Sequence, residues 1–248
     1  MKENCPFCGG DGPYSNEHIV PQWLLDVLDI RDLKIATTHM GTFGGVVSRR
    51  GPMQMSNFVN GRICAGCNNG WMSRLEAEVK PFVEALLNLD TSVLPQLQPL
   101  SVGLARWSLK TALVLNHQSN YRRLAPPTQY RDVCASVMPK GVTVNMGLTR
   151  DDSDFQFRQG QTVMAIGPPE EVKRATAEAY KITFQFRHLL VRVAYFPLDG
   201  YVLEDKSIYL WPVFGRPEEF ALFENIDDFD LSGGFVPGQW AGTETPTN

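Results

Sequence analysis

The stretches Cys5-Pro-Phe-Cys8 and Cys64-Ala-Gly-Cys67-Asn68-Asn69-Gly70-Trp71 contain the same pattern twice, a cysteine pair separated by two residues. Each CxxC pair places two thiolates on one tight turn, close enough to bind the same metal ion. Two such pairs supply the four sulfur ligands of a closed tetrahedral zinc site. We therefore expect one structural zinc ion that joins distant segments of the chain and is held by Cys5, Cys8, Cys64 and Cys67.

Between the two cysteine pairs lies the segment Glu17-His18-Ile19-Val20-Pro21. Glu17 can offer a hard oxygen ligand, His18 a proton acceptor near neutral pH, and Asn68 a carbonyl oxygen directly after the last cysteine. A four-thiolate zinc site has no open coordination position, so we expect the chemistry at these neighbours rather than at the zinc. The alternative is that Glu17 and His18 are surface residues of a strand and have no role in chemistry.

In combination these motifs resemble the HNH, or His-Me finger, nucleases, and most closely the zinc-stapled subgroup that includes the phage junction-resolving endonucleases. In that subgroup an Asp-His dipeptide lies between two CxxC pairs, and an Asn follows the final Cys, as Asn68 follows Cys67 here. The resemblance extends to about residue 80. Glu17 stands where the family has Asp, which adds one methylene to the side chain.

This resemblance implies a metal-dependent HNH endonuclease that hydrolyses nucleic-acid phosphodiester bonds, in DNA rather than RNA. Glu17 and Asn68 would hold a catalytic Mg²⁺ or Mn²⁺, and His18 would act as general base toward the attacking water. The family's middle Asn orients the catalytic His; Asn60 is the best match for it, and Asn57 is the second. One alternative is a non-catalytic zinc module that binds nucleic acid or protein. Another is an enzymatic C-terminal domain with the finger as its adaptor.

The charges are unevenly distributed, although the formal net charge is only −4. No acidic residue lies between Asp32 and Glu76, and residues 91–131 form a second acid-free stretch. Basic stretches without acidic residues are typical of a surface that faces a polyanion. We therefore expect nucleic-acid contacts from Arg49, Arg50, Arg62, Arg74, Arg122 and Arg123. Ordinary scatter of a few charges is the alternative interpretation.

Composition indicates a cytoplasmic protein without a membrane partner. No stretch approaches the roughly 18–20 apolar residues of a membrane span, and residues 1–5 lack an apolar signal region. Five cysteines, four of them in CxxC pairs, suit a reducing compartment with zinc better than a disulfide framework. We expect the fifth, Cys134, to be a buried and inert thiol.

The predicted fold class is α+β: a zinc-stapled ββα (HNH) finger with an inserted loop in residues 1–89, then a mixed helical and β-rich domain of unknown role in residues 90–248. The finger's helix is predicted from an apolar stripe of helical spacing, with Asn68 or Asn69 as its N-cap and a kink or an early stop at Pro81. The stripe consists of Trp71, Leu75, Val79, Phe82 and Leu86.

The other elements are predicted from hydrophobic periodicity and from turn residues. A strand that ends at Pro21 contains Glu17 and His18, and a short helix follows it. Within the inserted loop, residues 46–47 and 53–59 are predicted strands. The predicted helices farther along are 100–115, 128–137 and 169–179, and the predicted strands are 142–148, 161–166, 182–196 and 207–213.

Overall fold

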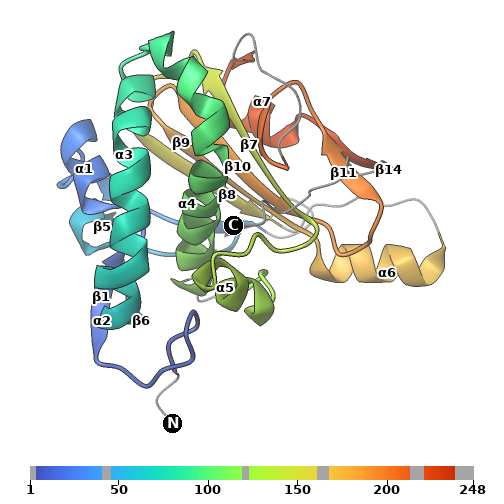
Figure 1. Cartoon of the computed structure of the whole chain (residues 1–248), viewed down its shortest axis with the longest axis horizontal. Coiled ribbons are helices and arrows are strands. Elements are labelled where there is room, and N and C mark those ends of the chain that lie inside the picture. Colours follow the sequence, from blue (N-terminus) through green and yellow to red (C-terminus); the bar gives the residue numbers. More distant parts are fainter. Residues whose placement is uncertain (1–3, 41–45, 119–122, 161–167, 213–220, 238–248) are drawn as a thin grey trace.

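An antiparallel sheet and two long helices form the centre of the protein (Figure 1). The computed structural model describes residues 4–40, 46–118, 123–160, 168–212 and 221–237. Its helices and strands agree with the predicted α+β class. Among the described residues, no helix is both long enough and apolar enough to cross a membrane.

The main sheet has the strand order β12-β7-β10-β9-β8, and the short strand β13 pairs with β7 in parallel. Its strands are β7 (Val142–Thr149), β8 (Phe155–Gly160), β9 (Tyr180–Phe186), β10 (Leu189–Tyr195), β12 (Ile208–Trp211) and β13 (Leu222–Phe223). Successive side chains of a strand point to opposite faces of a sheet. In β10, Val191 and Val193 therefore face one side, where they join the main core, and Arg192 faces the other side.

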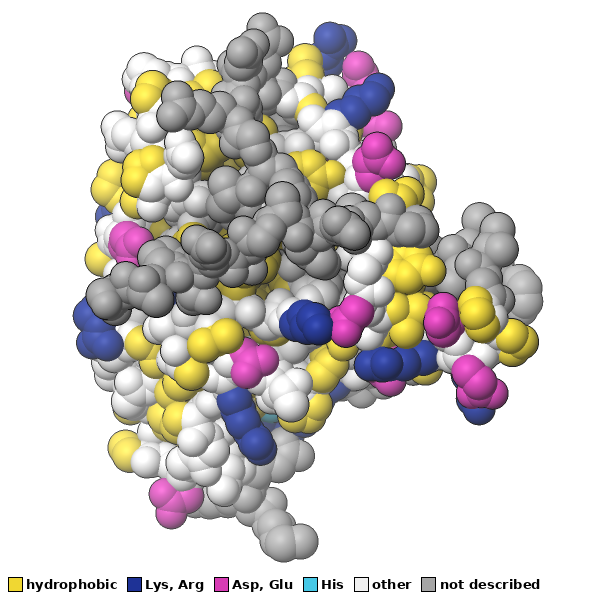
Figure 2. Space-filling view, turned by 45° about the vertical axis from the view of Figure 1, so that its right-hand side comes forward, with side chains coloured by type: hydrophobic (Ala, Val, Ile, Leu, Met, Phe, Trp, Pro, Cys, Tyr) yellow, Lys and Arg dark blue, Asp and Glu magenta, His cyan; other side chains and the backbone are white. Residues whose placement is uncertain are grey.

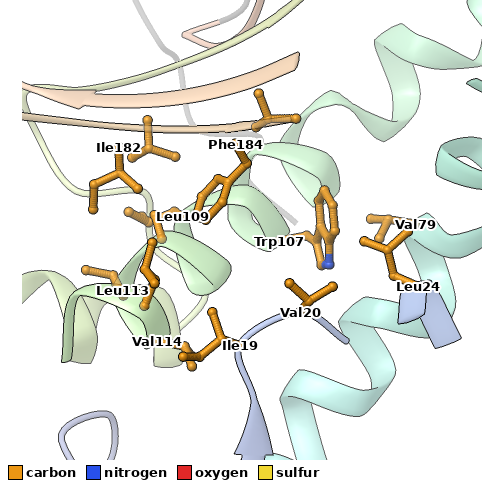
Figure 3. Close-up of a cluster of buried hydrophobic side chains, with 14 of the residues drawn as sticks. Ile19, Val20, Leu24, Val79, Trp107, Leu109, Leu113, Val114, Ile182 and Phe184 are labelled. Carbon is orange, nitrogen blue, oxygen red and sulfur yellow. The ribbon is translucent and has the colours of Figure 1, made fainter. Parts of the chain in front are cut away.

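Helix α4 (Leu97–Gln118) lies between this sheet and the N-terminal part of the chain. Figure 3 shows Ile19 and Val20 on one side of the helix and Phe184 on the other, with Trp107 and Leu109 of α4 between them. Buried side chains from both parts of the chain belong to one continuous core. A helix packed on two sides must be apolar nearly all round, which explains its sequence.

The N-terminal part is built on a hairpin of β1 (Tyr14–His18) and β6 (Val59–Cys64). Helix α1 (Gln22–Leu28) follows β1, and the two-stranded pairs β2–β5 and β3–β4 lie within the segment that precedes β6. Their bounds are β2 (Lys34–Ile35), β3 (Thr38–Met40), β4 (Val46–Arg49), β5 (Met53–Gln54) and the 3₁₀ turn η1 (Met55–Asn57). After β6 the chain forms α2 (Ala65–Cys67), the wide turn η2 (Asn68–Met72) and α3 (Ser73–Leu87), which lies beside α4 (Figure 1).

The remaining elements pack against the long helices or lie around the main sheet. Helix α7 packs against the face of the main sheet that is opposite α4. Arg192, which points to that face, donates a hydrogen bond of 2.7 Å to the backbone carbonyl of Phe229 in α7. Strands β11 and β14 pair with each other. The bounds are η3 (Thr91–Gln96), α5 (Pro127–Cys134), α6 (Pro169–Glu178), β11 (Tyr201–Glu204), α7 (Ile226–Leu231) and β14 (Gly234–Pro237).

Several predicted elements are confirmed, and others were wrong. Helices at 100–115 and 169–179 and strands at 142–148 and 207–213 are present, and the predicted strand 182–196 is the β9–β10 hairpin. The predicted helix 128–137 ends at Cys134. The predicted strand 53–59 contains the turn η1, and β8, β11 and α7 are among the elements that were not predicted. The predicted strand 161–166 lies outside the described residues.

Two local predictions for the finger's helix, the early stop at Pro81 and the N-cap, were also wrong. Helix α3 does not stop at Pro81 but continues to Leu87, because six buried apolar side chains anchor it on both sides of the proline. The N-cap is neither Asn68 nor Asn69: the helical segment already starts after Cys64, whose Sγ accepts the backbone N–H of Cys67. The cysteine turn thus supplies its own cap.

Candidate metal centre and catalytic site

The four cysteines of the two CxxC pairs form one cluster. Their Sγ atoms all lie within 4.8 Å of one another, close enough to hold one metal ion. Cys5 Sγ lies 3.9 Å from Cys67 Sγ, and Cys8 Sγ lies 3.5 Å from Cys64 Sγ, so each close contact joins the two segments. All four are free thiols rather than disulfides. We call this cluster the cysteine cage.

Each CxxC turn of the cage also donates a backbone N–H to a sulfur. Gly10 N lies 3.4 Å from Cys8 Sγ, and Cys67 N lies 3.3 Å from Cys64 Sγ. The N-terminal turn is closed by Gly9 in the left-handed region (φ 75°), where a residue with a side chain would be strained. Burial raises the pKa of the Cys64 thiol above its ordinary value, and the Cys67 amide opposes this shift without outweighing it.

Hydrogen bonds next to the cage hold the β1–β6 hairpin against the helical turn that follows it. Ala65 N donates to the carbonyl of Pro13 at 2.7 Å, next to the place where Tyr14 pairs with Cys64. Asn68, in the turn after the cage, donates its side-chain amide to Ser15 Oγ of β1 at 3.0 Å. The segment that contains Asn68 is therefore held against the strand that contains Glu17 and His18.

Glu17 and His18 are adjacent in β1 and point to opposite sides of the strand. His18 is half-buried, and its Nδ1 lies 3.2 Å from Nε2 of Gln22, the first residue of α1. Glu17 is buried and points inward. The structure thus separates a histidine that solvent can reach from a carboxylate in the interior.

The buried carboxylate of Glu17 is paired with a lysine from α4. Lys110 Nζ lies 3.1 Å from Glu17 Oε1 and 2.5 Å from Glu76 Oε1 of α3. The exposed fractions of the three side chains are 0% for Lys110, 7% for Glu17 and 17% for Glu76. We call Glu17, Lys110 and Glu76 the buried triad.

The surroundings of Glu17 and Lys110 shift the pKa values of both groups. Burial raises the pKa of Glu17 above its ordinary value, although the positive charge of Lys110 opposes this shift. Burial alone would lower the pKa of Lys110, but the carboxylates of Glu76 and Glu17 outweigh it and hold this pKa well above its ordinary value. Lys110 is therefore charged at neutral pH, and it compensates a carboxylate that water scarcely reaches.

Asn60 lies in β6 opposite Glu17 and is also buried. Its Nδ2 donates to the carbonyl of Val114 at 3.2 Å and lies 3.1 Å from His117 Nδ1, while its Oδ1 accepts the N–H of Arg62. These contacts join β6 to α4. Within the described part of the chain, the side chain at hydrogen-bonding distance from the His18 ring is Gln22 rather than Asn60. The second match for this role, Asn57, lies in η1.

The predicted nucleic-acid-binding arginines differ in their exposure. Arg49, Arg62, Arg74 and Arg123 are exposed and Arg50 is half-buried, whereas Arg122 lies outside the described residues. Arg49 is on the β3–β4 ribbon, beside Val46 and Val47, whose exposed fractions are 57% and 50%. On the face drawn in Figure 2, basic and acidic side chains are mixed, so the charges do not segregate there.

Three residues of this site were not identified from the sequence: Gln22, Glu76 and Lys110. One signal was available for Lys110, because a single lysine in a helix that is apolar nearly all round must have a buried partner. No comparable signal pointed to Glu76, which belongs to an ordinary amphipathic helix. Cys134, which was expected to be buried, is only half-buried.

Comparisons with known proteins identify no relative of this chain. No family model, no curated protein and no solved structure matches the chain. A function therefore has to be inferred from the cysteine cage, His18 and the buried triad.

Proposed function

We propose that the N-terminal part of this protein is a zinc-stapled nuclease module that hydrolyses nucleic-acid phosphodiester bonds, with DNA as the preferred substrate. The observation that carries the proposal is the arrangement around the cysteine cage. A strand ending in Glu17 and His18 pairs with a strand that runs through the cage into a helix. This order of strand, strand and helix matches what the resemblance to HNH nucleases implies.

His18 is the proposed general base. The Gln22 side chain next to its Nδ1 can present either its amide nitrogen or its amide oxygen to the ring. With the oxygen facing the ring, Nδ1 carries the proton and Nε2 keeps its lone pair. In that form Nε2 can accept a proton from a water molecule that attacks the phosphate.

Two kinds of metal ion belong to the proposal. The cage offers four sulfur ligands at mutually short distances, a donor set that suits structural zinc. For the catalytic ion, Glu17 and Asn68 offer the hard oxygen donors that Mg²⁺ or Mn²⁺ prefers, so they fit in chemical type. When bound, this ion would neutralise charge at the scissile phosphate.

One observation favours a second candidate function, a zinc module that binds nucleic acid without cleaving it. One carboxylate oxygen of Glu17 is already bound to Lys110 at 3.1 Å. If this ion pair is permanent, Glu17 serves to stabilise the fold and is not a metal ligand. The two candidates differ in what they predict for cleavage and for Mn²⁺ binding.

The first test is cleavage of plasmid and single-stranded DNA with Mg²⁺, Mn²⁺ or chelator. We expect the wild type to cleave with metal and His18→Ala to lower the rate by about 10²- to 10⁴-fold, because only proton abstraction is lost. Zinc content and melting temperature should not change. The matched control is His188→Ala, since the His188 ring lies against the backbone carbonyl of Thr149 at the end of β7.

An active His18→Ala protein would show that another group is the base. If the wild type is inactive with every metal and on single-stranded, duplex and branched substrates, yet still binds nucleic acid, the second candidate function is correct.

A separate prediction concerns the β3–β4 ribbon. The double variant Arg49→Gln/Arg50→Gln should bind duplex DNA more weakly and reduce the salt slope by roughly 1.8, since each lost phosphate contact removes about 0.9. Fluorescence anisotropy at several salt concentrations measures this slope. Arg174→Gln is the control, because Arg174 is an exposed arginine on the distant helix α6. An unchanged slope in the double variant would place the DNA-binding surface elsewhere.

A further inference from the structure

The proposed function uses Glu17 but leaves two members of the buried triad without a role. Lys110 has no exposed surface, and desolvating an ammonium group is unfavourable unless it is fully compensated. It lies in a helix whose buried side chains are mostly apolar, which gives no packing reason for a lysine. The two carboxylates around it therefore account for its presence.

The triad connects the proposed catalytic module to the rest of the fold. Glu17 is in β1, Glu76 is in the first turn of α3, and Lys110 is in the middle of α4. The ammonium lies nearer to Glu76 Oε1, at 2.5 Å, than to Glu17 Oε1, at 3.1 Å. Two carboxylates and one ammonium give the triad a net charge of −1, so one negative charge remains for another cation.

We propose that Lys110 is an internal counter-ion that competes with the divalent ion for Glu17, and that Glu76 retains the ammonium when Glu17 binds that ion. This inference rests on the proposed function, because it assumes that Glu17 is the ligand of a catalytic ion. Lys110 and Glu76 are positioning residues in this scheme. They do not touch the substrate, but they set the affinity of the site for the ion.

Charge compensation explains why both residues are needed. Without a divalent ion, the buried Glu17 carboxylate would lack a counter-charge unless Lys110 supplied one. With the ion bound to Glu17, Lys110 would lack a counter-charge unless Glu76 supplied it. Glu17 and Lys110 thus each have a counter-charge in both states, and the two positive charges avoid sharing one carboxylate.

The test measures Mn²⁺ affinity by the electron paramagnetic resonance signal of free Mn²⁺, on zinc-loaded protein. Lys110→Met should bind Mn²⁺ roughly tenfold or more tightly than the wild type, because a positive charge next to the ligand is removed. Glu76→Gln should bind it more weakly, because Lys110 is then left to Glu17 alone. Glu17→Gln should abolish this binding.

Glu78→Gln is the matched control, since Glu78 is an exposed glutamate on the same helix. It should leave the affinity unchanged. If Lys110→Met folds poorly, the rise of its melting temperature with added Mn²⁺ gives the same information, and Glu76→Gln tests the scheme without removing the buried lysine.

The outcomes separate this inference from the proposed function. Unchanged or weaker Mn²⁺ binding by Lys110→Met, together with unchanged binding by Glu76→Gln, overturns the competition even if the wild type is an active nuclease. Tighter binding by Lys110→Met supports the competition even if the wild type cleaves nothing, in which case the nuclease proposal fails. Absence of a Glu17-dependent Mn²⁺ site in every variant overturns the competition and the metal-ligand role of Glu17 together.

Discussion

Replacing Cys64 by serine should abolish metal binding by the cysteine cage and unfold the segments that the cage joins. Structural zinc sites have apparent binding free energies of about 10–16 kcal/mol in small zinc-finger peptides. This is as large as the whole stability of a typical protein, about 5–15 kcal/mol. Loss of one of the four thiolates is therefore expected to outweigh the other contacts of the hairpin β1–β6.

The loss of structure should be confined to the N-terminal part, because the backbone hydrogen bonds of the main sheet do not involve the cage or the β1–β6 hairpin. Hydrogen exchange should show lost protection in β1 and β6, while β7, β9 and β10 stay protected. Metal analysis should find one zinc per chain in the wild type and in Cys134→Ser, the control that changes the fifth cysteine. Clearly less than one equivalent of zinc in folded, fully protected wild-type protein would contradict the zinc assignment.

Sequence reasoning identified the cage because its signal is local. Two cysteines separated by two residues lie on one turn whatever the rest of the fold is. Only the proximity of the two turns depends on the tertiary structure. The same holds for α3 and α4, whose apolar spacing depends on helix geometry alone. For Glu17 and His18, alternation along the strand indicates that their side chains diverge, but not which of them is buried.

The buried triad could not be derived in this way. Its two ion pairs join residues that are 93 and 34 positions apart. Tertiary packing determines which helix lies against β1, and no local sequence pattern predicts it. Strands β3 and β8 were not predicted for a related reason, because strand pairing depends on partners that are distant in sequence. The ion pair of Glu17 with Lys110 is therefore found only from the folded structure.

Lys110→Met should lower the free energy of unfolding by about 3–5 kcal/mol at neutral pH, since it leaves two carboxylates in the interior without their counter-charge. Lys80→Met is the control: Lys80 and Glu84 form a partly exposed pair on α3 at 3.5 Å, and such pairs contribute about 0–1 kcal/mol. Urea unfolding followed by circular dichroism measures both. Equal stability of Lys110→Met and wild type would show that the buried ion pairs do not form.

The pH dependence of this loss identifies its cause. Burial already raises the pKa of Glu17 in the wild type, and removing Lys110 takes away the positive charge that opposes this rise. In Lys110→Met the folded state therefore binds a proton more strongly than the unfolded state, so stability increases as the pH falls from 7 toward the unfolded value of about 4.3. The difference between variant and wild type should shrink over this range. The double variant Glu17→Gln/Lys110→Met should show a smaller loss and a weaker pH dependence, because the buried carboxylate of Glu17 is then absent. If the loss is the same at pH 5 and pH 7, it comes from a packing defect rather than from uncompensated charge.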